Sequence, residues 1–493
     1  MIRPVQEYKA TCKELSNYLG LDCKIDFEFT GVVSNSKDLI SGDLFVALPG
    51  INNHGASFID SAITAGAVAV LTDSEGSVLV GGKLPTIVVE NPRKILGNIC
   101  AWFYDFPTTK FSLVGITGTN GKTTTTSLLN QIWHLANKDS ALIGTTGIAI
   151  GGDRFDTSFT TPEAPEIAAI FATICERHIP LAAMEVSSHA IELGRISGSR
   201  FKIAAFTNLT QDHLDFHGDM ESYFAAKSKL FTHEFAELGF INIDDDYGIR
   251  LFEKAEIPVV AISKSNRKAQ WHYDKIESLT NGYDVAIRGT GGILIEGRVG
   301  LIGEHNLDNL LMAVAIAFEN EIDPLLIGSK LHLLTGAAGR LEKVDLGQDF
   351  LALVDYAHTP DAVARVLASL RSQSTGKIIA VLGCGGDRDK SKRPLMGAQL
   401  LAGSDVAIFT SDNPRSENPD VILSEMTNGL DLREGDVVIA DRLEAIAFAV
   451  TTASPGDCLV MLGKGHETGQ EVSGVKYPFD DRIELARAIE ELS

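Results

Sequence analysis

FSLVGITGTNGKTTTT, residues Phe111 to Thr126, joins a run of apolar residues to a glycine-containing turn and a Thr-rich segment. The apolar run predicts a buried strand, the glycines predict a turn, and the Thr-rich segment up to Leu129 predicts the start of a helix. A turn of this kind between a strand and a helix presents backbone N–H groups to a phosphate chain. The stretch therefore predicts an α/β domain that binds a nucleotide.

Two side chains of this loop have chemistry that suits a nucleotide. Lys122 supplies a cation for the phosphates, and Thr123 supplies a hydroxyl for Mg²⁺. The first glycine, Gly118, comes later than in the common phosphate-loop pattern, which has glycine at the position of Ile116. We interpret the loop as a shortened variant, against the alternative that the glycines merely close a βα unit. The predicted ATP-binding residues of the loop are Gly118, Thr119, Asn120, Gly121, Lys122, Thr123 and Thr124.

Length and composition limit the class of protein. The 493 residues are enough for roughly three domains, and 44% hydrophobic with 22% charged residues is typical of a globular protein. A net charge of −22 argues against non-specific binding to nucleic acid or to an anionic membrane, because both require excess Lys and Arg. Neither a signal sequence nor an apolar run long enough for a membrane span is recognisable, so we expect a cytoplasmic protein without a membrane partner.

The six cysteines are scattered and lack the CxxC or zinc-ligand spacing of a metal site. We therefore expect reduced thiols that serve mainly in core packing. They are Cys12, Cys23, Cys100, Cys175, Cys384 and Cys458.

Residues 1–110 predict a first α/β domain. Apolar runs predict two strands within Gly31–Leu48 and one strand each at Val68–Leu71 and Thr86–Val89. Helices are expected at Ala56–Gly66 and Pro92–Phe106. This segment has no catalytic triad, metal cluster or phosphate loop, so its residues alone leave a binding role and a purely structural role open.

Residues 111–337 predict a central domain in which several apolar strands end in polar turns. Ligands of parallel α/β sheets gather at the carboxyl ends of the strands, so these turns are expected to converge beside the phosphate loop. Glu185 and His213, each in such a turn, are candidate ligands of nucleotide-bound Mg²⁺; the alternative is that both are surface charges. Alternating apolar residues and glycines predict a hairpin at the sheet edge over Asn281–Leu301.

Residues 338–493 predict a third α/β domain, with four apolar strands that each lead into a polar loop. Arg388 and Arg415 both lie just after a predicted strand. Arginine presents a planar fork that suits bidentate recognition of a carboxylate, so we expect these residues to bind a carboxylate-bearing ligand. Gly383–Asp389 is not a dinucleotide fingerprint, because Arg388 stands where the third glycine belongs.

Motifs along nearly the whole chain resemble the Mur ligase family. They are Gly118–Thr124, Glu185–His189, Asp212–Asp215, Gly303–Asn306, Asp355–His358, Gly383–Asp389, Asp412–Arg415 and Gly463–Glu467. The last three are similar to the family members that add the third residue of the peptidoglycan stem peptide. The resemblance implies an α/β fold of three domains: a UDP-binding N-terminal domain, a central ATPase domain with a mostly parallel sheet, and a Rossmann-like C-terminal domain.

The resemblance also implies an ATP-driven ligation. ATP would phosphorylate the D-glutamate carboxylate of UDP-N-acetylmuramoyl-L-alanyl-D-glutamate, and an incoming amine would displace phosphate from the acyl phosphate. Lys122 and Mg²⁺ would neutralise charge on the transferred phosphoryl group. The family has a carbamylated lysine at a second Mg²⁺ site, and Lys227 matches it. The implied catalytic residues are Lys122, Glu185, His213 and Lys227, the metal ligands are Thr123, Glu185, His213 and Lys227, and further ATP contacts are Asn306, Arg340 and Asp355.

The implied contacts to the UDP-sugar dipeptide are Ser34, Ser36, Asn52, Asn53, Thr160, Thr161, Ser187 and Arg195. The chain departs from the usual family residues at Asn35, Lys37, His54, Phe159 and Leu193. These departures concern the uridine and peptide contacts rather than the class of enzyme.

The third amino acid is expected to be meso-diaminopimelate, a lysine-like molecule with an extra carboxylate at its far end. Arg415 can pair with that carboxylate, whereas lysine would leave the guanidinium unpaired. A site built to bind such a group rejects an analogue that lacks it by roughly 10⁴-fold. The implied contacts are Arg388, Asp412, Asn413, Pro414, Arg415, Gly463 and Glu467. An L-lysine-adding ligase, a folylpolyglutamate synthase and a non-enzymatic ATP-binding scaffold are the alternatives. We expect a monomer.

Overall fold

The computed structural model describes residues 1–22, 25–50, 52–157, 159–279 and 282–492, without the side chains of residues 372 and 373. The described chain forms two compact units. The first consists of Met1–Tyr273, Ile287–Ile295 and Leu311–Ile327, and the second of Asp274–Ala286, Glu296–Leu310 and Gly328–Ser493.

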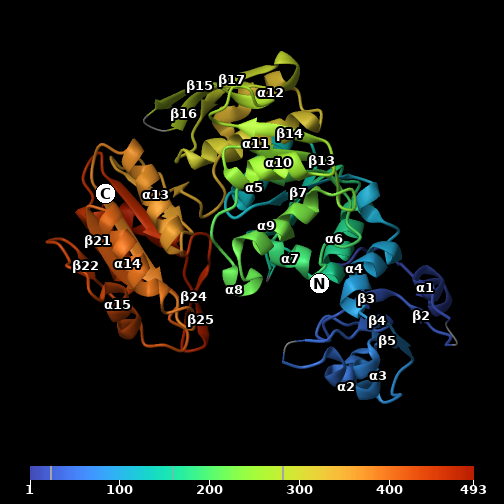
Figure 1. The fold of residues 1–493 in the computed structure, drawn as a ribbon. Helices are drawn as coiled ribbons and strands as arrows, with labels where there is room; N and C mark the ends of the chain where they lie inside the picture. Colours follow the sequence, from blue (N-terminus) through green and yellow to red (C-terminus); the bar gives the residue numbers. More distant parts are fainter. Residues whose placement is uncertain (23–24, 51, 158, 280–281, 493) are drawn as a thin grey trace. The chain divides into compact units, whose positions relative to one another are not determined.

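A parallel sheet of strand order β3-β4-β5-β6 organises the beginning of the first unit (Figure 1). The strands and helices predicted over residues 1–110 are present, and β1, β2, α1, α3 and η2 are additional to them. The strands are β1 (Ala10–Thr11), β2 (Glu28–Phe29), β3 (Gly31–Val33), β4 (Asp43–Val46), β5 (Ala69–Thr72) and β6 (Thr86–Val88). The helices are α1 (Cys12–Leu19), η1 (Gly55–Phe58), α2 (Ile59–Ala65), α3 (Ser74–Val80), α4 (Pro92–Phe103) and η2 (Pro107–Thr109).

Helix α4 joins this small sheet to the rest of the first unit. Its apolar side packs into a core cluster that also contains Ala164, Ala168 and Ala172 of α6. On α4, Gly97 lies so close to the following part of the unit that a Cβ there would be 2.2 Å from the carbonyl oxygen of Ser197. A side chain at this position would therefore separate the two elements.

The large sheet follows the order β10-β9-β8-β11-β7-β12-β13-β14-β15-β16-β17. Pairing is parallel from β8 to β15, and β9 and β10 add an antiparallel hairpin at one edge. The strands are β7 (Ser112–Thr117), β8 (Ser140–Gly144), β9 (Gly147–Ile150), β10 (Asp153–Phe155), β11 (Leu181–Glu185), β12 (Phe201–Phe206), β13 (Ala236–Asn242), β14 (Val259–Ser263), β15 (Trp271–Leu279), β16 (Gly282–Arg288) and β17 (Leu294–Val299). The predicted hairpin corresponds to the edge strands β16 and β17, although Asn281 lies outside the described residues.

Helices and short turns connect these strands. They are α5 (Lys122–Leu135), α6 (Ala164–Glu176), α7 (Ser188–Glu192), α8 (Leu214–His217), α9 (Met220–Ser228), η3 (Lys229–Phe231), α10 (Asp246–Lys254), η4 (Thr290–Gly292), α11 (His305–Glu319), α12 (Pro324–Lys330) and η5 (Leu331–Leu333). The central strands β7 and β11 are almost wholly buried, as expected for parallel strands covered on both faces. The predicted strand, turn and helix around the phosphate loop correspond to β7, residues 118–121 and α5.

The second unit has a sheet of order β18-β19-β23-β20-β21-β22, parallel except for β18. All four predicted strands of this region are present. The strands are β18 (Glu342–Lys343), β19 (Leu351–Asp355), β20 (Ile378–Cys384), β21 (Val406–Ser411), β22 (Val437–Val438), β23 (Cys458–Leu462), β24 (Gly469–Val472) and β25 (Val475–Pro478). The helices are α13 (Pro360–Gln373), α14 (Lys392–Gly403), α15 (Pro419–Thr427), α16 (Arg442–Thr452) and α17 (Asp481–Leu492).

The predicted α/β class with a mostly parallel sheet is confirmed, whereas one cysteine differs from expectation. Cys100, Cys175, Cys384 and Cys458 are free, but Cys12 is disulfide-bonded, so the prediction that every thiol is reduced is wrong. Sequence spacing does not show which cysteines approach one another in space, and Cys12 is fully buried at the start of α1. Cys23 lies outside the described residues.

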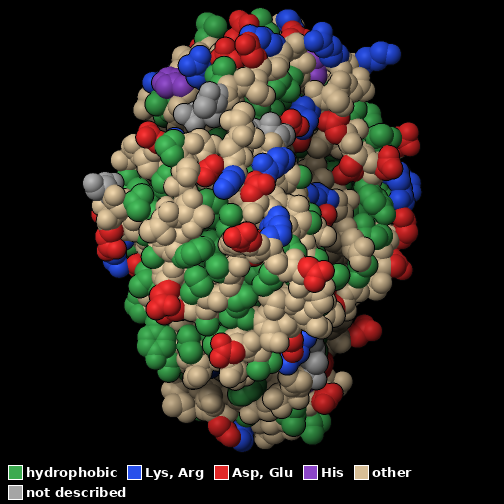
Figure 2. Space-filling model, turned by 90° about the vertical axis from the view of Figure 1, so that its left-hand side faces the viewer, with side chains coloured by type: hydrophobic (Ala, Val, Ile, Leu, Met, Phe, Trp, Pro, Cys, Tyr) green, Lys and Arg blue, Asp and Glu red, His purple; other side chains and the backbone are tan. Residues whose placement is uncertain are grey.

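The surface carries both signs of charge. On the face shown in Figure 2, Asp, Glu, Lys and Arg side chains are interspersed with apolar ones. Among the described helices, none is long and apolar enough to cross a membrane. The predicted domain boundaries at residues 110 and 337 stay predictions.

Candidate active site

The phosphate loop has a backbone that only glycine suits at its first position. Gly118 has φ +151°, and a Cβ there would be 1.9 Å from the Thr207 hydroxyl oxygen. Gly121 has φ +86° and directly precedes α5, whose first-turn N–H groups lack helical partners. These features form the N–H-lined turn at a helix N-terminus that an anionic phosphate requires.

The end of β12 holds this loop in place. The amide of Asn120 donates to Asn208 Oδ1 at 3.0 Å, and the Thr207 hydroxyl donates to the Asn120 carbonyl at 2.6 Å. Thr119 N donates to the Asn208 carbonyl at 2.9 Å. The loop is thus ordered by the polar turn that follows a neighbouring strand.

Glu185 faces the beginning of α5 from the end of β11. It is fully buried, and its Oε2 accepts a hydrogen bond from the Thr123 hydroxyl at 2.9 Å. Thr145, in the turn after β8, donates its amide to Oε1 at 2.8 Å and its hydroxyl to Oε2 at 3.2 Å. A Cβ at Gly144 would be 2.2 Å from Oε1, so glycine leaves room for this carboxylate.

Lys227 lies on α9 and is 1% exposed. Its Nζ donates to the Gly118 carbonyl at 2.9 Å, and Lys122 Nζ donates to the same carbonyl at 2.9 Å. Burial, together with the positive charge of Lys122, lowers the pKa of Lys227 well below its usual value, because both disfavour a second ammonium. The amine therefore has a reactive neutral form beside the phosphate loop.

His213 belongs to a group of rings next to Lys227. Its ring centroid is 4.8 Å from that of His189 and 6.0 Å from that of Tyr223, over which Lys227 Nζ lies at 4.7 Å. His213 has a left-handed backbone, φ +53°, which is uncommon outside glycine and concentrates at functional sites. Partial burial lowers its pKa despite the nearby Asp212 carboxylate, so the neutral, ligand-competent imidazole is favoured.

The predicted contacts to the peptide part of the substrate gather beside Glu185. The Thr161 hydroxyl donates to the Glu185 carbonyl at 2.8 Å and accepts from Ser187 N at 3.0 Å. Arg195 donates to the Thr161 carbonyl at 3.0 Å, and the hydroxyl oxygens of Thr145 and Thr160 are 3.2 Å apart. Three loops that are far apart in sequence therefore meet here.

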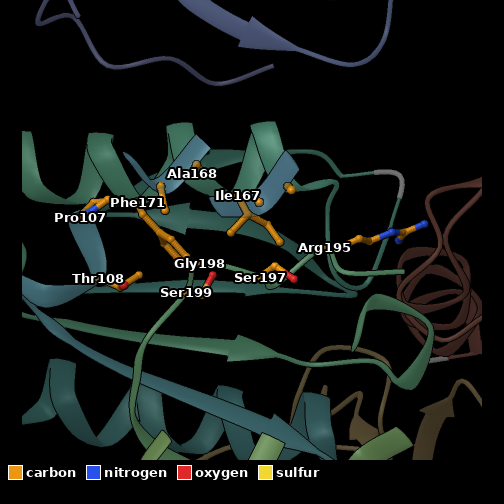
Figure 3. A pocket seen from close by; sticks show the side chains of 12 residues that line it. Pro107, Thr108, Ile167, Ala168, Phe171, Arg195, Ser197, Gly198 and Ser199 are labelled. Atoms are coloured by element: carbon orange, nitrogen blue, oxygen red, sulfur yellow. The ribbon is translucent and has the colours of Figure 1, made fainter. Parts of the chain in front are cut away.

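A small recess borders this group (Figure 3). It is lined by α6 side chains such as Ile167 and Phe171, by Thr108 and by the segment from Ser197 to Ser199, whereas the Arg195 side chain extends away from them. The Arg195 guanidinium is instead 4.7 Å from the centre of the Phe159 ring, and its Nε is 3.0 Å from Glu163 Oε1. Phe159, a departure from the family pattern, thus supports the arginine through a cation–π contact.

The predicted uridine contacts lie after β3 and β4, which pair in parallel, so their loops share one sheet edge. Ser34 and Ser36 are half-buried, whereas Asn52 and Asn53 are exposed. Two departures from the family pattern have local explanations. Asn35 Oδ1 accepts from Lys37 N at 3.1 Å in a turn, and His54 Nδ1 accepts from Ala56 N at 3.0 Å as a helix cap.

The other predicted ATP contacts lie in the second unit. Asp355 ends β19, is 5% exposed and accepts from the amides of Leu341 and Ala357, each at 2.8 Å. The Arg340 guanidinium is 4.7 Å from the centre of the Tyr356 ring. Asn306 is buried and donates to the Ile302 carbonyl at 2.7 Å.

The loop after β21 carries the predicted amino-acid contacts, and a buried cation organises it. Lys464 is 0% exposed, with its Nζ 3.5 Å from Asp412 Oδ1, 3.2 Å from Glu467 Oε2 and 3.3 Å from Asn413 Oδ1. It also donates to the Gly469 carbonyl at 2.8 Å. Asn413 completes the network by donating to Glu467 Oε2 at 2.8 Å.

Arg415 follows this network with a left-handed backbone, φ +51°. Its Nη1 donates to the Gly386 carbonyl at 2.6 Å, and the Pro414 carbonyl approaches so closely that a Cβ at Gly386 would be 2.0 Å away. Gly463 has φ +106° and donates to the Asp355 carbonyl at 3.1 Å. Arg388 is exposed in the loop after β20.

Sequence reasoning missed three contributors to these sites. Thr145 binds both oxygens of Glu185, but it follows β8, a strand that was not among those predicted. Asn208 holds the phosphate loop, and its place in the polar turn after a predicted strand was the available signal. Lys464 lies inside the motif Gly463–Glu467, but a lysine in sequence gives no indication that it will be buried.

The donors around Glu185 fit a hard divalent cation. A carboxylate and the Thr123 hydroxyl are oxygen ligands of the kind Mg²⁺ prefers, and the two are in contact. Across the described ranges, no group of three or more His, Cys, Asp or Glu side chains is arranged to hold a metal. Any cation here therefore depends on hydroxyl, phosphate or modified side-chain oxygens in addition to Glu185.

Comparison with known proteins establishes the class. The chain matches the Mur ligase family, catalytic domain over residues 28–104, the Mur ligase middle domain over 116–317 and the Mur ligase, glutamate ligase domain over 339–465. The chain belongs to the Mur ligase family, as the sequence motifs predicted.

Individual members of this family are similar to the chain over nearly its whole length. A UDP-N-acetylmuramoyl-L-alanyl-D-glutamate--2,6-diaminopimelate ligase of Streptomyces coelicolor is 44% identical, over 99% of this chain and 98% of that protein. A solved structure of a ligase with the same name has a TM-score of 0.71 at 30% identity, over 98% of this chain and 99% of that one. A Thermotoga maritima MurF ligase in complex with ADP shares the fold, with a TM-score of 0.61 at 17% identity, over 94% of this chain and 96% of that one.

Proposed function

We propose that this chain is an ATP-dependent ligase that joins meso-2,6-diaminopimelate to the D-glutamate of UDP-N-acetylmuramoyl-L-alanyl-D-glutamate, in peptidoglycan precursor synthesis. The observation that carries the choice of amino acid is Arg415, whose guanidinium is held by the Gly386 carbonyl next to the buried Lys464 network. The names of the full-length relatives support the same assignment.

In this proposal the phosphate loop binds ATP for the phosphoryl transfer that activates the D-glutamate carboxylate. Backbone N–H groups of the loop and of α5 bind the ATP phosphates, and Lys122 neutralises charge on the transferred γ-phosphoryl group. Glu185 and the Thr123 hydroxyl would hold Mg²⁺, which supplies further positive charge at the phosphate oxygens. The D-glutamate carboxylate attacks the γ-phosphorus, ADP leaves, and the amine of the third amino acid then displaces phosphate.

Lys227 is proposed to be carbamylated. Its neutral amine can add to CO₂ with release of a proton, which converts a cationic side chain into an anionic oxygen donor. The lowered pKa of Lys227 supports this step, because only the unprotonated amine is nucleophilic. His213 is proposed as a neutral ligand in the same site.

The remaining predicted contacts complete the assignment. Ser34, Ser36, Asn52, Asn53, Thr160, Thr161, Ser187 and Arg195 are proposed to bind the UDP-sugar dipeptide, and Asn306, Arg340 and Asp355 to bind ATP. Arg388, Asp412, Asn413, Pro414, Arg415, Gly463 and Glu467 are proposed to bind diaminopimelate. The enzyme is proposed to act as a cytoplasmic monomer, which light scattering would test against the chain mass of 53.0 kDa.

A competition assay tests the function. Purified protein is given ATP, the UDP-linked dipeptide and either meso-diaminopimelate or L-lysine, and phosphate release is followed together with the product mass. We expect kcat/KM for meso-diaminopimelate to exceed that for L-lysine by at least ~10²-fold. Equal or faster turnover of L-lysine would indicate a lysine-adding ligase. Glutamate-dependent turnover with folate would indicate a folylpolyglutamate synthase, and ATP binding without phosphate release would indicate a scaffold.

A further inference from the structure

The hairpin formed by β24 and β25 is hydrogen-bonded through its main chain to the loop after β21, which contains Asn413 and Arg415. Arg415 N donates to the Glu471 carbonyl at 2.9 Å, and Ser473 N donates to the Arg415 carbonyl at 2.6 Å. Glu471 N donates to Asn413 Oδ1 at 2.9 Å. Glu471 is therefore fixed at the side of Arg415 by its own backbone.

The side chain of Glu471 faces the arginine that the proposed function assigns to the ligand carboxylate. Its Oε2 is 3.5 Å from Arg415 Nε, with the glutamate side chain 42% exposed and the arginine side chain 23% exposed. Lys476 is the cross-strand neighbour of Glu471, but its side chain lies over Gly469, where a Cβ would be 2.3 Å from Lys476 Cε. Arg415 is thus a cationic partner of Glu471 within the described structure.

The geometry of the guanidinium makes this contact relevant to specificity. A carboxylate binds an arginine through two parallel N–H donors along one edge of the fork. Because Nη1 of Arg415 donates to the Gly386 carbonyl, the edge that contains Nε and Nη2 is the suitable one for a ligand. Glu471 flanks that edge at Nε.

We propose that Glu471 is a specificity-determining residue, whose carboxylate takes the place of the ligand's distal carboxylate on Arg415 and is displaced when a dicarboxylic amino acid binds. This inference rests on the proposed function. The contact is long for a hydrogen bond and partly exposed, so it is weak enough to be exchanged. Glu471 has two effects: it competes with the distal carboxylate, and it neutralises Arg415 when a lysine-like ligand leaves that guanidinium without a partner.

Glu471→Gln separates these effects from the fold, since it keeps the shape and the backbone contacts. A partly exposed ion pair is equivalent to about a two- to five-fold change in binding. We expect the KM for meso-diaminopimelate to fall by about that factor, and the ratio of kcat/KM for diaminopimelate over L-lysine to rise by at least as much. The KM for ATP is expected to stay unchanged. Glu434→Gln, which removes an exposed carboxylate before β22, is the matched control and is expected to change neither constant.

A double-mutant cycle with Arg415→Ala tests whether the effect passes through the arginine. Glu471→Gln is expected to have no effect on the KM for diaminopimelate in the Arg415→Ala background. An unchanged or higher KM in the single Glu471→Gln variant would overturn the inference, and so would an equal fall without Arg415. Thermal unfolding of each variant verifies that the fold is retained. A wild-type protein inactive with diaminopimelate would refute the proposed function, whereas an active wild type with an unresponsive Glu471→Gln variant refutes this inference alone.

Discussion

Arg442 and Asp481 form a fully buried ion pair in the second unit, at the ends of β21 and β23. Arg442 donates from Nε to Asp481 Oδ1 at 2.8 Å and from Nη2 to Oδ2 at 2.6 Å, and both side chains are 0% exposed. Arg442 also donates to the carbonyls of Ser411 at 3.2 Å and Leu462 at 3.0 Å. Ser411 is the last residue of β21 and Leu462 is the last residue of β23. The ion pair therefore links the two strand ends that lead into the proposed amino-acid site.

Removing the arginine alone is expected to be costly. Arg442→Met leaves a buried carboxylate without its counter-charge and leaves two strand-end carbonyls without a donor. Breaking a buried pair in this way costs about 3–5 kcal/mol, because the remaining charge stays desolvated. If the two strands open with the global unfolding of their unit, amide hydrogen exchange in β21 and β23 is expected to accelerate by at least ~100-fold.

Hydrogen exchange followed by mass spectrometry, on peptides that cover β21 and β23 of the full chain, measures this effect. Arg487→Met is the matched control, because Arg487 makes a surface pair with Glu484 on α17, the helix that begins with Asp481, and surface pairs contribute at most about 1 kcal/mol. The double variant Arg442→Met/Asp481→Leu is expected to recover much of the protection, since it also removes the unpaired charge. An acceleration below ~10-fold in Arg442→Met, or a double variant no better than the single one, would refute the reasoning.

Three further predictions concern the proposed active site. In Gly144→Ala the new Cβ would be 2.2 Å from Glu185 Oε1, so we expect kcat to fall by about 10²-fold with little change in thermal unfolding. Gly300→Ala is the control, because a Cβ there would meet no residue beyond its chain neighbours within 4 Å, and an unchanged kcat in Gly144→Ala would contradict the prediction. Arg415→Ala is expected to raise the KM for diaminopimelate by about 10- to 100-fold while the KM for ATP is unchanged, and unaltered diaminopimelate kinetics would exclude Arg415 from the site. The pKa of Lys227 in the folded protein lies below its usual value of 10.5. At a pH between the folded and the unfolded pKa, the unfolded chain binds more protons than the folded one, so the free energy of unfolding rises with pH, by at most about 1.4 kcal/mol per pH unit. Lys227→Met is expected to lose this rise when denaturation is measured from pH ~7.5 to ~10 in metal-free buffer without CO₂, and equal slopes in both proteins would contradict it.

Local sequence patterns were sufficient for most of the fold. Apolar runs followed by polar turns predicted the buried strands β7, β11, β12 and β19, because parallel strands covered on both faces need continuous apolar residues. The same patterns missed α1 and α3, two short helices of the first domain. Their amphipathic patterns extend over only two turns, which is little periodicity for a prediction.

The candidate site was predictable in part, because its loops lie at the carboxyl ends of parallel strands. Topology therefore brings Glu185 to the phosphate loop, and the structure adds the specific contact with Thr123 at 2.9 Å. Contacts that depend on side-chain direction were outside the reach of the sequence. Thr145 faces Glu185 from a turn and Glu471 faces Arg415 from strand β24, and the spacing of residues encodes neither direction.

Lys227 and Lys464 show how differently two buried lysines behave once their surroundings are known. Each is at most 1% exposed, and each donates a hydrogen bond to a backbone carbonyl. Lys464 also has the carboxylates of Asp412 and Glu467 within ion-pair distance, and these contacts connect the loop after β21 to the loop after β23. For Lys227, burial and, after it, the positive charge of Lys122 lower the pKa and favour the neutral amine. Both lysines are buried, so they differ in the sign of the charge beside them: a like charge accompanies the lysine suited to chemical modification, and carboxylates accompany the lysine that organises a binding loop.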